Sequence, residues 1–158
     1  MNIAPTTLDT QAGTAMGVAS VADAGDLSRA LGLVRRVAVD PSGRATLEYE
    51  AGLHMCHSGG VVQGGFISAW LDSAMAQAVM AQRGVEMTPM SLELKISFFA
   101  PARPGPVFAE GWVEKSGRST CFTEGRLLDS EGVVLAKASS TIRLIPRAKV
   151  EADARAAG

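Results

Sequence analysis

The sequence predicts an α+β fold in which one long helix lies against a largely antiparallel β-sheet. A nearly continuous apolar stretch between the glycines at 64–65 and at 84 is typical of a buried helix of about 18 residues. Several other segments alternate polar and apolar residues, which is typical of strands with one solvent-facing side. Three prolines follow residues 91–98 within a short connection, so this strand is not expected to pair in a hairpin with the next one.

The size and composition of the chain limit what it can be. Its 158 residues predict one domain, and a hydrophobic share of 47% excludes intrinsic disorder. The formal net charge of −1 provides no broad basic surface, so neither nucleic acid nor an anionic membrane is an expected partner. Two cysteines, Cys56 and Cys121, are too few for a disulfide framework and indicate reduced thiols in a cytoplasmic protein.

We expect a single domain over residues 26–145, flanked by a flexible N-terminal segment, 1–25, and a flexible C-terminal tail, 146–158. The N-terminal segment contains no Lys or Arg and no sustained apolar run, so neither a signal peptide nor a transit peptide is predicted. A cytoplasmic location without a membrane span is therefore expected.

Each element of the domain follows from a local pattern. Residues 26–32 begin at a capping Asp and end at Gly, which predicts a short helical turn. The turn Asp-Pro-Ser-Gly joins two strands, 33–39 and 45–50, and a glycine-rich loop, 52–65, leads into the helix. Four strands are expected after the helix, at residues 91–98, 107–115, 120–128 and 133–144.

The long helix is the most informative element because it is apolar nearly all round, with Trp70 on the side opposite Asp72. A helix that lay on a flat sheet and faced water would show a polar stripe. We therefore expect the sheet to curl around this helix, a second subunit to cover it, or both.

Two glycines, Gly64 and Gly65, stand where the helix begins. The first N–H groups of a helix have no intrahelical partner, so they can donate to a carbonyl oxygen that becomes negative during acyl transfer. The pair therefore predicts an oxyanion hole; the alternative is that the glycines only allow a tight turn or close packing.

Asp72 lies two turns further along, and its neighbours on the helical wheel are small or medium-sized residues, among them Gly65 and Ser68. Small neighbours leave room for a ligand, and a partly buried carboxylate suits the activation of water or direct attack on a carbonyl group. The alternative is a carboxylate that faces water at a gap in the sheet.

Other polar residues give weaker signals. His54, Cys56 and His57 lack a second ligand cluster, so no metal site is predicted. Lys115 and Arg118 at a hairpin tip, together with Arg103 in the proline-rich connection, are candidates for binding phosphates or are solvated turn residues.

Three segments together resemble a known family: the run from Gly60 to Asp72, the strand and connection at 91–101, and the Gly117-Arg118 turn. They are similar to the hotdog-fold acyl-CoA thioesterases of the phenylacetic-acid-degradation (PaaI-like) type, which are related to 4-hydroxybenzoyl-CoA thioesterase. The resemblance covers about residues 33–145. It implies a curved, six-stranded antiparallel sheet around one helix, with the site formed between the subunits of a homodimer or homotetramer.

The resemblance also implies roles for individual residues. Gly64 corresponds to the glycine whose N–H polarises the thioester carbonyl, and Asp72 to the acidic nucleophile or general base. Ser91 falls close to a strand Ser or Thr that assists the attacking water, while Gly117 and Arg118 match a turn near the coenzyme A phosphates. The substrate-binding candidates are Gly65, Ser68, Arg103, Lys115, Gly117 and Arg118.

Two positions depart from the family pattern, since Gln63 replaces the usual His and His57 replaces the usual Asn. We retain both as candidate catalytic residues, although Gln63 cannot carry a proton at neutral pH. The expected activity is hydrolysis of acyl-CoA, without a cofactor because coenzyme A is part of the substrate. The alternatives are a hotdog protein that binds acyl-CoA or another apolar ligand without hydrolysis, and a purely structural subunit.

Overall fold

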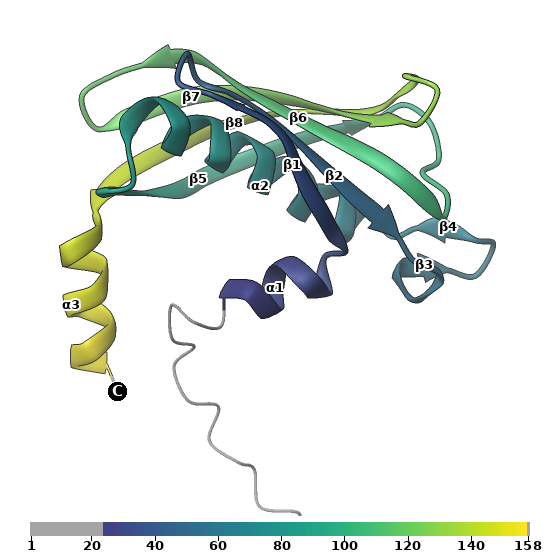
Figure 1. The fold of residues 1–158 in the computed structure, drawn as a ribbon, viewed down its shortest axis with the longest axis horizontal. Coiled ribbons are helices and arrows are strands. Elements are labelled where there is room, and N and C mark those ends of the chain that lie inside the picture. The colour runs from purple at the N-terminus through teal and green to yellow at the C-terminus, as the bar shows by residue number, and fades with distance from the viewer. Residues whose placement is uncertain (1–23, 158) are drawn as a thin grey trace, which may run out of the picture.

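The computed structural model describes residues 24–157, so the predicted flexible N-terminal segment lies almost entirely outside the described residues. The predicted α+β class and the order of the main strands and helix are confirmed (Figure 1). The elements are α1 (Ala24–Ala30), β1 (Leu33–Asp40), β2 (Arg44–Ala51), the short 3-10 helix η2 (Leu53–Met55), β3 (Cys56–His57), β4 (Val61–Val62), α2 (Gly64–Arg83), β5 (Met87–Phe98), β6 (Gly105–Ser116), β7 (Thr120–Asp129), β8 (Val134–Pro146) and α3 (Arg147–Ala157).

The main sheet has six antiparallel strands in the order β1-β2-β6-β7-β8-β5. Strand β5 pairs with β8 and not with its successor β6, as the proline-rich connection predicts. Because β8 occupies one side of β5, the other side is left at the edge of the sheet. A separate two-stranded sheet, β3-β4, lies in the loop before α2.

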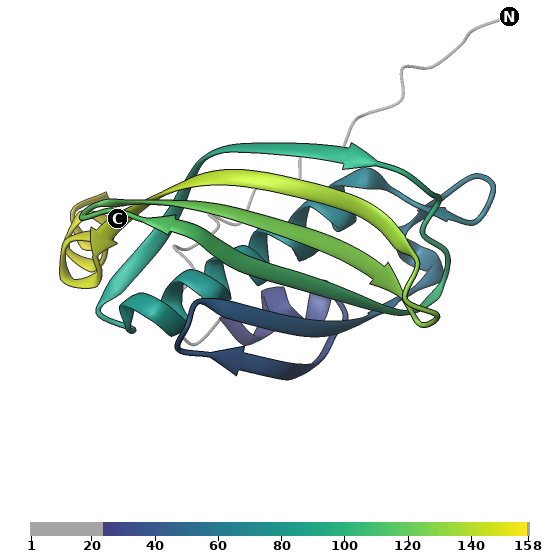
Figure 2. The ribbon, with the colours of Figure 1, turned by 90° about the horizontal axis from the view of Figure 1, so that it is seen from above.

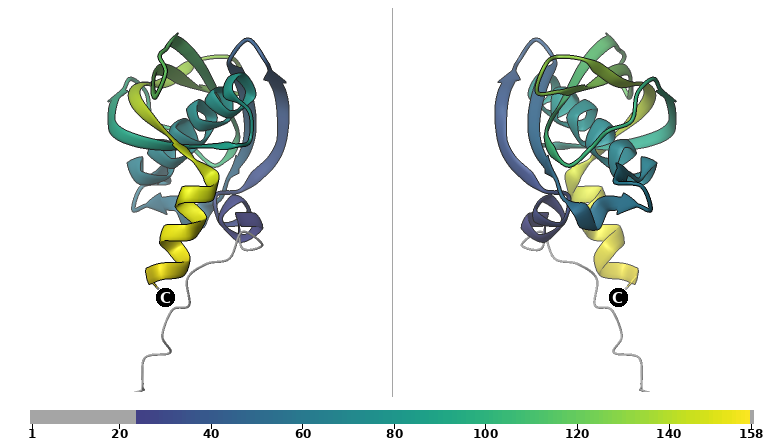
Figure 3. Two further views of the ribbon diagram at one scale, coloured as in Figure 1. Left: turned by 90° about the vertical axis from the view of Figure 1, so that its left-hand side faces the viewer. Right: turned by 90° about the vertical axis from the view of Figure 1, so that its right-hand side faces the viewer.

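The sheet curves around α2, which contacts all six strands (Figures 2 and 3). Trp70 is fully buried, stacks on Tyr49 with ring centroids 5.6 Å apart, and donates a hydrogen bond from its indole N–H to the Leu31 carbonyl. Gly111 on β6 allows a close approach of the sheet to the helix, since a Cβ there would lie 2.5 Å from the backbone of α2. The prediction that the sheet wraps the helix is therefore confirmed.

One face of α2 remains half-buried. Asp72 lies on this face with small neighbours, namely Ser68, Ala69, Ser73 and Ala76. The sequence predicts a helix that is covered nearly all round, but the sheet of one chain leaves this face half-buried. The half-buried face bears a carboxylate that is flanked by small side chains.

The C-terminal residues form helix α3, where the sequence predicted a flexible tail without indicating secondary structure. The helix projects away from the sheet in Figure 1, and none of its side chains is buried. Alanine, lysine, arginine and glutamate favour helix formation even without a packed face. This helix propensity of residues 147–157 is the sequence signal for α3.

Candidate functional site

The start of α2 is capped by Gln63, whose backbone is extended (φ −66°, ψ 136°). The side-chain Oε1 of Gln63 accepts a hydrogen bond from the Gly65 N–H at 2.6 Å, and its carbonyl accepts one from Phe66. The Gly64 N–H makes no hydrogen bond to any residue within 24–157. Gly64 therefore provides the donor that is open to a ligand, whereas Gly65 would first have to release Gln63.

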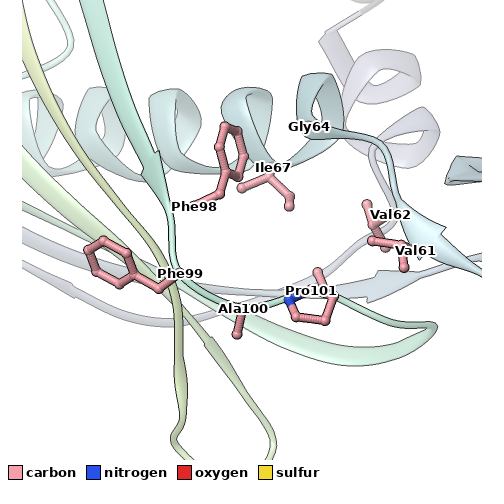
Figure 4. A pocket seen from close by; sticks show the side chains of 9 residues that line it. Val61, Val62, Gly64, Ile67, Phe98, Phe99, Ala100 and Pro101 are labelled. Atoms are coloured by element: carbon pink, nitrogen blue, oxygen red, sulfur yellow. The ribbon is translucent and has the colours of Figure 1, made fainter.

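An apolar pocket of about 390 Å³ opens beside this donor (Figure 4). It is lined by Val61, Val62, Gly64, Ile67, Phe98, Phe99, Ala100, Pro101 and Ala102, none of which is charged. Phe98 packs against the helix start, since a Cβ on Gly64 would lie 3.1 Å from the end of its ring. The pocket can therefore hold an uncharged apolar group next to the Gly64 N–H.

Asp72 and Ser91 come together between α2 and β5. The Ser91 hydroxyl donates a hydrogen bond to the Asp72 carboxylate, with 2.6 Å between Oγ and Oδ1. A register shift at Leu92 makes this possible. The shift places Ser91 opposite Ile142, which is fully buried and faces the helix.

The uninterrupted alternation predicted for residues 91–98 is therefore wrong at Leu92, because a β-bulge interrupts it. Without the bulge, Leu92 would share a face with the apolar Leu94 and Ile96, and Ser91 would point outward. Leu92 is instead 62% exposed. The bulge thus places the serine hydroxyl on the carboxylate.

Gly64 and Asp72 cannot act on one carbonyl group within a single chain. They are eight positions apart on α2, which corresponds to about 12 Å along the helix axis at ~1.5 Å per residue. An oxyanion donor and a base or nucleophile must both lie within about 3–3.5 Å of the reacting group. The two predicted site residues therefore lie at separate points along the helix of one chain.

The other candidate residues near the helix start have local partners. The His57 Nδ1 lies 2.9 Å from the Ser58 carbonyl oxygen, a contact that places the proton on Nδ1 and leaves Nε2 as an acceptor in the neutral ring. The Ser68 hydroxyl donates to the Gly64 carbonyl one turn earlier, at 2.8 Å. No group of three His, Cys, Asp or Glu side chains that could hold a metal ion occurs in the part of the chain that the structure describes.

The residues predicted to bind phosphates fall into two groups. Lys115, Gly117 and Arg118 lie at the β6–β7 turn, which contacts Arg83 at the C-terminal end of α2. Arg103 is near the opposite end of the helix, where it lines a second pocket of about 380 Å³ that shares Ala100 and Pro101 with the apolar one. The helix is roughly 30 Å long, so the two groups do not form one binding site within a chain.

Comparison with known proteins identifies the family. The sequence profile of the thioesterase superfamily matches residues 59–136. A protein of Saccharolobus solfataricus that is provisionally assigned as an esterase is 32% identical over 110 residues, which cover 70% of this chain and 77% of that protein. The chain belongs to the thioesterase superfamily.

Solved thioesterase structures share the fold. A phenylacetic acid degradation-related protein from Ralstonia eutropha JMP134, provisionally described as a thioesterase, superposes with a TM-score of 0.70 at 31% identity, covering 75% of this chain and 89% of that one. The PaaI protein of E. coli gives a TM-score of 0.70 at 20% identity, with coverage of 76% and 84%. A hypothetical thioesterase of Streptococcus pneumoniae TIGR4, solved with coenzyme A, gives 0.65 at 16% identity, with coverage of 71% and 85%.

In this thioesterase-superfamily member, sequence reasoning missed three residues at the candidate site. Phe98 and Phe99 line the apolar pocket, and Arg83 binds the β6–β7 turn. The first two could have been noticed as adjacent aromatic residues in a chain that is only 5% aromatic. Arg83 gave no separate signal, because a basic residue in the last turn of a helix is common. Among the described helices, none is long and apolar enough to cross a membrane.

Proposed function

We propose that this protein hydrolyses acyl-CoA thioesters to a free acid and coenzyme A. The observation that carries the proposal is the half-buried Asp72 carboxylate, held by the Ser91 hydroxyl at 2.6 Å on the incompletely covered face of α2. The apolar pocket beside the Gly64 N–H supports it, because an acyl group and its carbonyl oxygen need such neighbours. Membership of the thioesterase superfamily supports thioester hydrolysis in general.

We further propose that the active site forms between two copies of the chain. Strand β5 has an open edge, and Leu92, Phe98 and Phe99 on or beside it are more than half exposed. Antiparallel pairing of two β5 strands would place the Ser91 end of one against the Phe98 end of the other. Such pairing would bring Gly64 close to the partner subunit's Asp72 and close the gap of about 12 Å between the two half-sites.

The chemistry that follows is a general-base hydrolysis. The thioester carbonyl oxygen accepts a hydrogen bond from the Gly64 N–H while its acyl group occupies the apolar pocket. Asp72 takes a proton from a water molecule whose oxygen attacks the carbonyl carbon, and Ser91 holds the carboxylate in position. The carbon–sulfur bond then breaks, and the thiolate takes the proton from Asp72. In the nucleophilic alternative, Asp72 attacks the carbonyl carbon, the carbon–sulfur bond breaks and the thiolate leaves, and water then hydrolyses the resulting anhydride.

Coenzyme A is proposed as the thiol because the β6–β7 turn carries the exposed cations Lys115 and Arg118, which suit phosphate groups. The pneumococcal thioesterase solved with coenzyme A shares this fold and supports the same choice. We propose no separate cofactor. The cytoplasmic location and the choice between dimer and tetramer stay predictions.

A panel of short, medium, long and aryl acyl-CoAs, with trapping of the released thiol, tests the proposal. The native protein should release thiol, and Asp72→Asn should abolish most of the release. Asp153→Asn on α3 is the matched control, because it removes an exposed carboxylate far along the chain from α2. Ligand-induced thermal stabilisation without thiol release would identify a binding protein, and the absence of both would favour a structural subunit.

A further inference from the structure

Arg83, the last residue of α2, forms hydrogen bonds with three successive residues of the β6–β7 turn. One terminal guanidinium nitrogen donates to the Ser116 hydroxyl at 2.8 Å and to the Gly117 carbonyl at 2.7 Å. The other donates to the Arg118 carbonyl at 3.2 Å. A planar guanidinium can satisfy this set of acceptors at once, which the single ammonium of lysine does less well. The half-buried Arg83 therefore ties the end of the catalytic helix to the turn.

The turn that Arg83 holds is positively charged. Lys115 and Arg118 are exposed, and the ion pairs that the structure gives, Arg35–Glu48 and Arg126–Glu110, do not involve them. The Gly117 N–H donates to the Thr120 carbonyl at 2.7 Å, so the backbone of the turn is fixed on its other side as well. Exposed cations on a turn whose backbone is held, and which form no ion pair within residues 24–157, are suited to an anionic ligand.

The length of α2 indicates which anion reaches this turn. Asp72 and Arg83 are eleven positions apart, or about 16 Å along the axis, whereas Gly64 and Arg83 are nineteen positions apart, or about 28 Å. The pantetheine arm of coenzyme A has about 13 bonds from sulfur to phosphorus, which span roughly 15 Å when extended. A thioester at Asp72 can therefore place its phosphates at the turn of the same chain. A thioester at Gly64 alone would need the turn of a second copy.

We infer that Arg83 is a positioning residue for the nucleotide end of the substrate. It holds the Ser116–Arg118 turn so that the side chains of Lys115 and Arg118 meet the coenzyme A phosphates. The subunit that supplies Asp72 also supplies this turn. The inference rests on the proposed acyl-CoA hydrolysis and adds to it a residue that touches no substrate atom.

A purely structural role of Arg83 has to be distinguished, because a cation in the last turn also stabilises a helix. Arg83→Gln removes the charge and most of the grip, while Arg83→Lys keeps the charge at the helix end. Gln82→Ala is the matched control: the Gln82 side chain also bonds a loop carbonyl, that of Ser42 at 3.2 Å, but in the β1–β2 turn. Each variant is assayed on an acyl-CoA and on the same acyl group carried by N-acetylcysteamine, which lacks the phosphates.

We expect Arg83→Gln to raise KM for the acyl-CoA about tenfold with kcat within about twofold, and to leave kcat/KM for the N-acetylcysteamine thioester unchanged. Arg83→Lys should give an intermediate KM, and Gln82→Ala should change neither substrate selectively. In a background that carries both Lys115→Ala and Arg118→Ala, adding Arg83→Gln should raise KM little further, because the contacts that Arg83 positions are already lost.

Equal losses on both substrates, or an unchanged KM for the acyl-CoA in both Arg83 variants, would overturn the inference. A native enzyme that uses both thioesters equally well would also overturn the inference about Arg83, whereas the proposed thioester hydrolysis would still hold. Failure of the native protein to hydrolyse either thioester would instead refute the proposed function itself. A thermal melt of each variant shows whether the fold is intact, and the Arg83→Lys variant keeps the test valid if Arg83→Gln does not fold.

Discussion

Replacing Gly64 by proline removes the proposed oxyanion donor while leaving the helix able to form. Gly64 is the first residue of α2, where proline is well tolerated because its missing N–H has no intrahelical partner. Gln63 before it is extended, with ψ at 136°, and this is the conformation that a following proline requires. The substitution therefore replaces the hydrogen of this N–H by the ring Cδ of proline, at small cost to the backbone.

The expected loss follows from the number of donors. Gly65 is engaged by Gln63, so Gly64 supplies the open N–H at this helix start, and losing one such donor costs about 10²–10³ in kcat, or about 2.7–4 kcal/mol. Gly64→Ala is the matched variant because it keeps the N–H. Its added Cβ would lie 3.1 Å from the end of the Phe98 ring, a contact that the proline shares and that a small movement of the ring relieves.

The comparison of interest is kcat of Gly64→Pro against Gly64→Ala on one acyl-CoA, with urea unfolding to confirm that both are folded. The ratio of the two kcat values measures the loss of the N–H together with the ring Cδ that takes its place, since the crowding of Phe98 is common to both. Equal kcat values in two folded variants would refute the reasoning, because another donor would then carry the oxyanion.

Four further changes have defined outcomes. Asp72→Asn should lower kcat by about 10²–10⁴, and Ser91→Ala should lower it by a smaller factor that Ser97→Ala, on the outer face of the same strand, does not reproduce. Gly111→Ala should destabilise the fold by about 1–3 kcal/mol in urea, because its Cβ would meet the α2 backbone; an unchanged midpoint would contradict the close packing. Burial raises the pKa of Tyr49 above its usual 10.0. The contribution of Tyr49 to the free energy of unfolding is therefore fully present below pH 10 and is lost as the pH rises through the folded-state pKa. Tyr49→Phe should remove this alkaline loss, and a loss of equal size in the variant would show another cause.

The main elements could be predicted from the sequence because their signals are local. The helix is bounded by Gly64 and Gly84, and Gly84 adopts a positive φ of 82° with its N–H bonded to the Met80 carbonyl. The prolines that separate β5 from β6 correctly indicated that these strands are not neighbours. Glycine widens the range of accessible backbone conformations and proline narrows it. Both effects are local, so they depend little on the rest of the fold.

The arrangement of the candidate site could be predicted only in part. The bulge at Leu92 depends on pairing with β8 and on the apolar side chains of both strands, and no short sequence pattern reports such a shift. The hydrogen bond from Gly65 to Gln63 depends on a side-chain rotamer at a helix cap. The sequence predicts one phosphate-binding group from the charges of Arg103 and Arg118, whereas the fold places these residues near opposite ends of α2. Long-range strand pairing decides all such distances.

The most direct test of the central claim, a hydrolytic site shared between two chains, is the activity of a purified heterodimer. One chain carries Asp72→Asn and the other carries Gly64→Pro, so each homodimer lacks one half of every site. A heterodimer of the two retains one intact site, in which Gly64 of the first chain meets Asp72 of the second, and should show about half the kcat of the native dimer. A heterodimer no more active than the two homodimers would contradict the shared site.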